Sequence, residues 1–114
     1  MKFRLLVLDV DGTLLNSKRE LTKRTIATLV KVQQLGIRIA LASGRPAHGI
    51  LPLAKALGMD RQGGFIIAHN GAVVMDAASG EVIFERSIDQ QMIPFMERLA
   101  KRAQMTLACY EGDE

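Results

Sequence analysis

Two aspartates that follow the first apolar segment of the chain are the residues best suited to chemistry. Asp9 and Asp11 are separated by one residue, and Gly12 follows them. Two carboxylates this close repel each other unless a divalent cation such as Mg²⁺ lies between them or one of them holds a proton. An ionised carboxylate can attack phosphorus as a nucleophile, while a protonated neighbour can act as an acid. These residues therefore favour a metal-assisted site for a phosphorylated substrate.

A second group of polar residues, Ser43-Gly44-Arg45, precedes Pro46. Proline is typical of the first turn of a helix, so a helix is expected to begin here. The N-terminus of a helix, with a hydroxyl beside it, binds phosphate well. Gly44 would allow the backbone to come close to a ligand. This segment is therefore a candidate phosphate site.

The elements around these groups predict that the two groups meet. Residues 3–10 are almost all apolar and are expected to form a central strand, buried on both faces of a parallel sheet. A helix with Thr22 as its N-cap and Gly36 after its end should follow, and then a strand over residues 37–42. Such a strand–helix–strand unit is parallel and right-handed, so its strand ends are neighbours. Both candidate groups should open onto one crevice.

The rest of the chain predicts further alternating elements. We expect a helix over residues 46–57 that Pro52 kinks or shortens, a strand over 65–69 and a tight turn at Asn70-Gly71. Two antiparallel strands should follow over residues 72–75 and 81–85. A helix is then expected from Asp89 to about Ala103, and the start of a strand over residues 106–110. The fold class is therefore α/β.

Three segments resemble motifs of one known family. DVDGTLL, ASGRP and AHNGA are similar to motifs of the haloacid dehalogenase-like hydrolases, in particular the Cof-type phosphatases with a C2B cap. The resemblance covers nearly the whole chain. It implies a Rossmann-like parallel sheet core with a β-hairpin in residues 1–86, and the start of an α+β cap domain in residues 87–114.

The resemblance also implies roles for individual residues. Asp9 would be the nucleophile that becomes an aspartyl-phosphate, and Asp11 the general acid and base. The Asp9 carboxylate and the Asp11 main-chain carbonyl would hold Mg²⁺. The substrate would be a small phosphorylated metabolite, with sugar phosphates the expected class. The residues implied on the phosphate or substrate side are Ser43, Gly44, Arg45 and Asn70.

Part of the family's catalytic set has no counterpart in the chain. The family has a third-motif lysine and a fourth motif, usually GDGxND, after the cap, and Gly112-Asp113 lacks the rest of that motif. We therefore expect the chain to be the N-terminal portion of a longer phosphatase and to be inactive by itself. The alternative is a catalytically incomplete fragment or a non-catalytic module that binds Mg²⁺ or phosphate.

Two other uses of the acidic residues fit less well. In an EF-hand loop that begins at Asp9, the sixth position should be glycine, but it is Leu14. A receiver domain carries its acceptor aspartate at the end of a middle strand, where this chain has Ser43 or the His69-Asn70 pair.

Composition excludes several other classes of protein. The chain has 114 residues with 15 Lys and Arg against 12 Asp and Glu, and the basic residues form no stripe with interleaved aromatics, so no nucleic-acid partner is expected. No apolar segment has the ~20 residues of a membrane span or the roughly 7–15 of a secretory leader, so no membrane partner is expected. The single Cys109 favours a cytoplasmic protein and is expected to be buried. The oligomeric state stays open, although an unpaired cap start would favour self-association.

Overall fold

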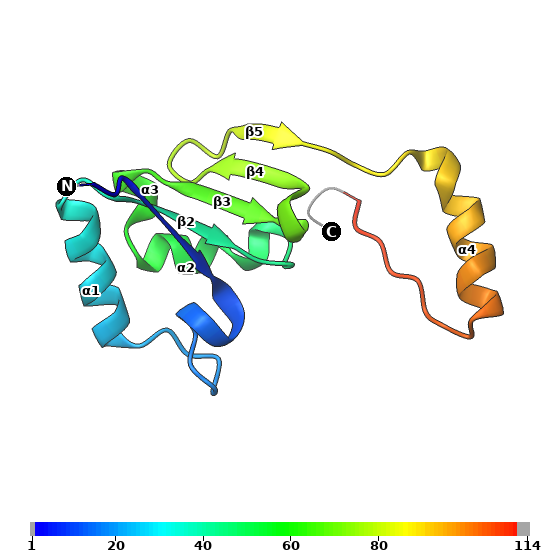
Figure 1. Ribbon diagram of the computed structural model, residues 1–114, viewed down its shortest axis with the longest axis horizontal. Helices are drawn as coiled ribbons and strands as arrows, with labels where there is room; N and C mark the ends of the chain where they lie inside the picture. Colours follow the sequence, from blue (N-terminus) through cyan, green and yellow to red (C-terminus); the bar gives the residue numbers. More distant parts are fainter. Residues whose placement is uncertain (1, 112–114) are drawn as a thin grey trace.

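The computed structural model describes residues 2–111 (Figure 1). Met1 and residues 112–114, which include the Gly112-Asp113 pair, lie outside the described residues. Five strands form one sheet in the order of the chain, with β1 to β3 parallel and β4 and β5 antiparallel. Their bounds are Leu5–Asp9 (β1), Arg38–Ala42 (β2), Phe65–Ala68 (β3), Val73–Asp76 (β4) and Val82–Glu85 (β5). The expected α/β class, with a β-hairpin after the parallel strands, is confirmed.

The first helix forms where its capping residues predict it. Helix α1 (Lys23–Gln34) begins after Thr22, whose hydroxyl accepts a hydrogen bond of 3.2 Å from the Thr25 backbone N–H. Gly36 follows the helix with φ 81°, a backbone conformation that glycine adopts without a steric penalty. Capping signals of this kind act locally, so the sequence alone locates the helix.

The helix expected over residues 46–57 is shortened, as Pro52 predicts, but its start is wrong by several residues. A short 3-10 turn (Ala47–Gly49) precedes α2 (Leu51–Ala56), and a further short helix, α3 (Met59–Gln62), was not expected. Pro52 lacks an N–H and is tolerated only in the first turn, so the regular helix begins at Leu51. Gly58, with φ 74°, separates α2 from α3.

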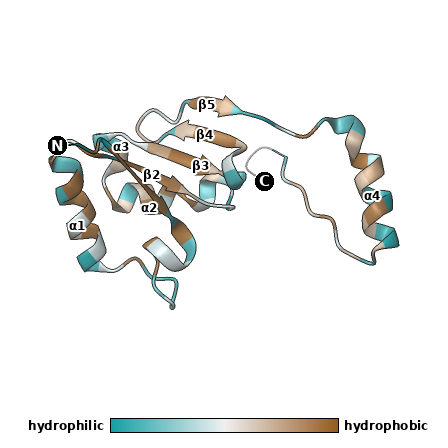
Figure 2. Ribbon diagram, in the orientation of Figure 1, coloured by the Kyte–Doolittle hydropathy of each residue, from teal (hydrophilic) through white to brown (hydrophobic). Residues whose placement is uncertain are grey.

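The core lies on one face of the sheet, under α1, α2 and α3. Gln33 of α1 donates a 2.8 Å hydrogen bond to the Leu57 carbonyl at the end of α2, so these helices lie side by side on this face. The fully buried side chains among them are Ile39, Leu41, Ile50, Leu57, Met59, Ile66 and Val10. Hydropathy colouring shows the strands as the most apolar part of the chain (Figure 2).

The expectation that the first strand is central and buried on both faces is wrong for the described chain. Leu6 and Leu8 pack against the core, but Leu5 and Val7 point the other way and are 47% and 53% exposed. Within residues 2–111, β1 is an edge strand because its only partner is β2. No helix of this part of the chain covers the opposite face of the sheet (Figure 1). The apolar sequence of β1 thus predicts more burial than these residues provide.

After β5 the chain extends away from the sheet as an arm that carries α4 (Ile93–Arg102) (Figure 1). The Asp89 side chain accepts a 2.9 Å hydrogen bond from the Gln91 backbone N–H and starts this helical segment, as predicted. None of the α4 residues is buried. The radius of gyration is 16.6 Å, against about 13 Å for a compact chain of this length. The assignment of residues 87–114 to a cap domain stays a prediction.

Two expectations for the end of the arm are wrong. Residues 106–110 form no strand, because no neighbouring strand is present in the described chain to pair with them. Cys109 is exposed rather than buried for the same reason, since no layer covers this segment. Among residues 2–111, no helix is long and apolar enough to cross a bilayer.

Candidate active site

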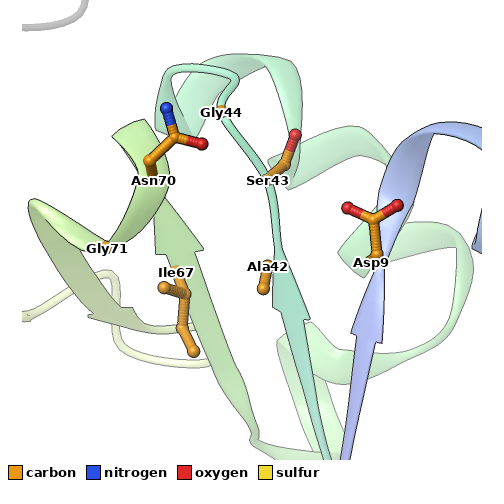
Figure 3. Close-up of a pocket in the computed structure, with 7 residues that line it drawn as sticks. All are labelled: Asp9, Ala42, Ser43, Gly44, Ile67, Asn70 and Gly71. Atoms are coloured by element: carbon orange, nitrogen blue, oxygen red, sulfur yellow. The ribbon is translucent and has the colours of Figure 1, made fainter.

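Three loops meet at the carboxyl ends of β1, β2 and β3 and line an open pocket of about 310 Å³ (Figure 3). Ligands in open α/β sheets bind beyond these strand ends. The register pairs Asp9 with Ala42, which places the carboxylate at the end of β1 beside the loop that follows β2. The residues that line the pocket are Asp9, Ala42, Ser43, Gly44, Ile67, Asn70 and Gly71. The expected meeting of the first acidic loop with the serine loop is therefore observed.

Asp9 lies at one side of the pocket and is held from within its own loop. After β1 the chain makes a single turn (Val10–Leu14), closed by a 3.0 Å hydrogen bond from the Leu15 N–H to the Val10 carbonyl. Gly12 has φ 79°, which permits this turn. Thr13 donates a 3.3 Å hydrogen bond from its hydroxyl to Oδ2 of Asp9. The other carboxylate oxygen, Oδ1, is left free for a ligand in the pocket, as far as the described residues go.

The serine loop is fastened to the loop after β3. Ser43 donates its backbone N–H to the Ile67 carbonyl at 2.9 Å, and its own carbonyl accepts the N–H of Asn70 at 3.1 Å. The Arg45 carbonyl accepts the N–H of His69 at 3.0 Å. The Ser43 Oγ accepts the Arg45 N–H at 3.1 Å, as in the first turn of a helix. These bonds hold the Ser43 hydroxyl at the pocket between Asp9 and Asn70 (Figure 3).

Asp11 does not line the pocket, because Arg45 holds its carboxylate. The guanidinium donates two hydrogen bonds to Asp11, Nη2 to Oδ1 at 2.6 Å and Nε to Oδ2 at 3.0 Å. A third bond of 3.4 Å, from Nη1 to the Gly49 carbonyl, orients the guanidinium. The hydrogen bond from Arg45 lowers the pKa of Asp11 below its ordinary value, and the same bond raises the pKa of Arg45. In this arrangement the Asp11 carboxylate is ionised and accepts hydrogen bonds, so it has no proton to donate as an acid.

The donor set suits a hard cation but supplies only part of a site. The Asp9 carboxylate and the main-chain carbonyl of Asp11 are the kind of oxygen ligands that Mg²⁺ prefers. Among residues 2–111, no three His, Cys, Asp or Glu side chains are grouped so that they could hold a metal ion. The residues present therefore fit Mg²⁺ in chemical type and leave most of its coordination to other groups.

Comparison with known proteins identifies the family. Residues 6–114 match the haloacid dehalogenase-like hydrolases. A haloacid dehalogenase-like hydrolase from Bacteroides thetaiotaomicron superposes on 90% of this chain with a TM-score of 0.82 and 43% identity, and the match covers 39% of that structure. The chain belongs to the haloacid dehalogenase-like hydrolase family.

Curated relatives of this haloacid dehalogenase-like chain are named phosphatases. The phosphatase YwpJ of Bacillus subtilis is 31% identical over 88 residues, which are 77% of this chain and 30% of YwpJ. A phosphoglycolate phosphatase of Methanospirillum hungatei is 31% identical over 110 residues, which are 95% of this chain and 46% of that enzyme. The chain spans about a third of the length of the first relatives that it matches, 31% of one and 32% of the other.

The structure brings most, but not all, of the predicted site residues of this family member together. Asp9, Ser43, Gly44 and Asn70 line one pocket, whereas Asp11 and Arg45 pair with each other beside it. Thr13, whose hydroxyl contacts Asp9, was not predicted as a site residue. Its position four residues after Asp9, within one turn, was the available signal. Three further lining residues were not predicted either, because small or apolar side chains carry no chemical signal. They are Ala42, Ile67 and Gly71.

Proposed function

We propose that this chain forms the N-terminal part of a Mg²⁺-dependent phosphomonoester hydrolase for small phosphorylated metabolites, with sugar phosphates as the expected class. The observation that supports this most is the position of the Asp9 carboxylate and the Ser43 hydroxyl at one pocket beyond the strand ends. The pocket, at about 310 Å³, is near the small end of the range for ligand sites. The single Cys109 favours action in the cytoplasm.

In the proposed reaction, Asp9 and Asp11 divide the work. A carboxylate oxygen of Asp9 forms a bond to phosphorus as the bond from phosphorus to the leaving oxygen breaks, and Asp11 gives its proton to that oxygen. Water then attacks the aspartyl-phosphate, its proton passes to Asp11, and the Asp9 carboxylate is released with inorganic phosphate. Ser43 donates a hydrogen bond from its hydroxyl to the transferring phosphoryl group, and the residues expected near that group are Gly44, Arg45 and Asn70.

Two conditions follow for this mechanism. Mg²⁺, held by the Asp9 carboxylate and the Asp11 carbonyl, would offset the repulsion between a carboxylate nucleophile and an anionic phosphate. Asp11 must also leave Arg45 before it carries a proton, since the two hydrogen bonds at 2.6 and 3.0 Å favour its ionised form.

The nucleophile is tested on the chain itself with beryllofluoride, which mimics a phosphoryl group on a carboxylate. In the presence of Mg²⁺, fluorine NMR should show a bound signal for the unsubstituted chain and none for Asp9→Asn. Asp60→Asn, which removes an exposed carboxylate of α3 away from the pocket, is the matched control and should bind normally. Equal binding by Asp9→Asn would contradict the assignment.

Turnover is tested in a longer protein. Residues 1–114 should be inactive on an aryl phosphate, whereas a hybrid in which they replace the matching part of the Bacteroides thetaiotaomicron relative should hydrolyse it with Mg²⁺. Asp9→Asn should lower the hybrid's kcat by several orders of magnitude, because covalent catalysis then has no nucleophile. Hydrolysis that survives this substitution would refute the proposed role.

The alternative proposal is a module that binds Mg²⁺ or phosphate without turnover. It is favoured by the finding that no three acidic, histidine or cysteine side chains are grouped for a metal among residues 2–111. Beryllofluoride binding by the chain together with an inactive but folded hybrid would support this alternative over the hydrolase.

A further inference from the structure

Asn70 and Gly71 form a pair of residues that is chemically labile. In an Asn-Gly pair the main-chain nitrogen of glycine can attack Cγ of asparagine, because glycine has no Cβ to hinder the approach. The bond from this nitrogen to Cγ forms as the bond from Cγ to Nδ2 breaks, and ammonia leaves with the proton of the glycine N–H. Water then opens the five-membered imide ring to aspartate or isoaspartate. Of the two asparagines in the chain, Asn16 and Asn70, only Asn70 precedes a glycine.

The Asn70 side chain is open to this attack. It is exposed at the rim of the pocket, and its carboxamide takes part in no hydrogen bond among residues 2–111 (Figure 3). A methyl group at residue 44 would lie 3.5 Å from Cγ of Asn70, so Gly44 leaves the reacting carbon without a side-chain neighbour on that side. A carboxamide in these surroundings can turn toward the main chain without first breaking a hydrogen bond.

The main chain of the turn also permits the rearrangement. At ψ 33° the Gly71 nitrogen does not face Cγ of Asn70, so the bond between Cα and the carbonyl carbon of Asn70 must rotate. The hydrogen bonds donated by the N–H groups of His69 and Asn70, at 3.0 and 3.1 Å, lie on the N-terminal side of that bond and can stay in place. The rotation would break the 3.2 Å hydrogen bond from the Ala72 N–H to the His69 carbonyl. Gly71, with φ 95°, can absorb the change because glycine adopts many backbone conformations.

Asn16 is also exposed, but its carboxamide is held in place. Its Oδ1 accepts the backbone N–H groups of Lys18 and Glu20, both at 2.9 Å, and its Nδ2 donates to a Glu20 carboxylate oxygen at 3.2 Å. It also precedes Ser17, whose side chain hinders the approach of the main-chain nitrogen. The same reaction at Asn16 would break these three hydrogen bonds, so solvent exposure alone does not decide which asparagine reacts.

Asp11 and Gly12 could close the same kind of ring from an aspartate. Both carboxylate oxygens of Asp11 accept hydrogen bonds from Arg45, at 2.6 and 3.0 Å. An ionised carboxylate resists attack by a nitrogen, because it carries negative charge and has no good leaving group. Asn70 is therefore the residue at which ring closure is expected.

We propose that Asn70 is a site of spontaneous deamidation, which replaces the neutral carboxamide at the pocket by a carboxylate. The reaction needs only water and the chain itself. In the isoaspartyl product the main chain passes through Cβ and Cγ, so it is also longer between residues 70 and 71. The new negative charge lies at the same pocket as Asp9 and repels an anionic ligand there. This effect on a ligand rests on the proposed function, whereas the modification itself does not.

The modification is measured on the folded 114-residue chain during incubation at neutral to mildly alkaline pH. Trypsin places Asn16 in the peptide 5–18. Asn70 lies in the peptide 62–86. Mass spectrometry should show the second peptide gaining the mass difference between NH₂ and OH, in an aspartyl and an isoaspartyl form that separate on chromatography. Asn70→Gln should abolish this gain, because glutamine would have to close a larger ring.

The opposing explanation is that the folded turn protects Asn70. Incubation in urea, where the chain is unfolded, gives a reference rate for each asparagine. Folding should slow the modification of Asn16 about tenfold or more, as expected when two or more hydrogen bonds must break, and should slow that of Asn70 less. Modification through global unfolding would instead slow both asparagines by the same factor. That result, or an Asn70 that stays unmodified in the folded chain, would overturn the proposal.

The effect on the pocket is measured by beryllofluoride binding with Mg²⁺. The bound fluorine NMR signal of the unsubstituted chain should fall in proportion to the modified fraction, and Asn70→Asp should show the loss without incubation. The signal of Asn70→Gln, compared with that of its own fresh sample, should not change with age. Full binding by the modified chain would refute the effect on the pocket. A fresh, folded chain that binds no beryllofluoride would refute the proposed function, while the modification of Asn70 is decided by mass spectrometry alone.

Discussion

Among single residues, Arg45 has the largest influence on what the acidic loop can do. Its guanidinium holds both carboxylate oxygens of Asp11, at 2.6 and 3.0 Å, while its main chain contacts the Ser43 hydroxyl and the N–H of His69. One residue therefore connects the loops after β1, β2 and β3. With side chains 33% and 52% exposed, the Arg45–Asp11 pair adds little to global stability, but its paired hydrogen bonds fix the direction of Asp11.

Asp76 leads to a prediction about how the stability of the fold depends on pH. Asp76 closes the turn between β4 and β5, where Oδ1 accepts the backbone N–H of Ser79 at 2.8 Å, the backbone N–H of Ala78 at 2.9 Å and the Ser79 hydroxyl at 3.1 Å. The backbone hydrogen bond from Ser79 is the main reason that the pKa of Asp76 lies below its ordinary value. A carboxyl group whose pKa is lower in the folded state stabilises the fold at pH values above its pKa in the unfolded chain, about 3.9. This stabilisation is lost as the pH falls through the pKa of the folded state.

The prediction is tested with Asp76→Asn, which keeps an oxygen acceptor but cannot ionise. The free energy of unfolding of the unsubstituted chain, measured by urea denaturation from about pH 6 downward, should fall more than that of Asp76→Asn. The contribution of Asp11 is present in both proteins and cancels in the difference. Parallel pH curves would show that the Asp76 turn is not linked to protonation.

At the scale of elements, the contact between β2 and the turn before β3 depends on a glycine. Gly64 has φ 137°, and a methyl group there would lie 2.5 Å from the Ile39 carbonyl oxygen and 2.8 Å from Cε of Met59. The Ile39 carbonyl belongs to a strand in the middle of the parallel sheet and cannot move aside. Its neighbour Gly63 has φ 78° but nothing within 4 Å of such a methyl group.

These two glycines form a matched pair for a stability measurement. Gly63→Ala should lower the free energy of unfolding by about 1–3 kcal/mol, because φ 78° with ψ 178° is a backbone conformation that essentially only glycine adopts. Gly64→Ala should lower it by about 3 kcal/mol or more, because a clash with backbone adds to unfavourable φ. Equal losses in chemical denaturation would show that the close approach at Gly64 does not exist in solution.

At the scale of the whole molecule, much apolar surface lacks a covering layer. On the side of the sheet away from the helices, Leu5 and Val7 are about half exposed, and all β5 residues are exposed. On α4, Phe95 and Leu99 are four residues apart, so they lie on one side of the helix, and each is 49% exposed. Figure 2 shows apolar and polar residues interleaved along this helix. A parallel sheet is normally covered on both faces, so this surface should associate with other apolar surface.

We therefore expect the 114-residue chain to self-associate as its concentration rises in sedimentation velocity. Replacing Phe95 and Leu99 by glutamine should reduce association without loss of the fold, since no α4 residue is buried. The matched control replaces Glu97 and Arg98 of the same helix by glutamine and should leave association unchanged. A chain that stays monomeric at all concentrations, or that responds equally to both pairs, would contradict the role of the apolar stripe.

Features that arise from short-range interactions could be predicted from the order of the amino acids. The Thr22 cap, the break at Gly36 and the hairpin between β4 and β5 depend on hydrogen bonds and backbone preferences within a few residues. The two motif loops also followed from sequence, because a parallel strand–helix–strand unit places its strand ends together. This is why Asp9 and Ser43 were correctly expected at one pocket.

Features that depend on residues far apart in the chain could not be predicted before the fold was known. Asp11 turns to Arg45, 34 residues away, and this choice between a pocket and a guanidinium has no local sequence signal. The exposure of β1 and of Cys109 was mispredicted for a related reason. Apolar sequence indicates that a surface needs cover, whereas burial requires a second element that lies against it, and residues 2–111 supply none at these places.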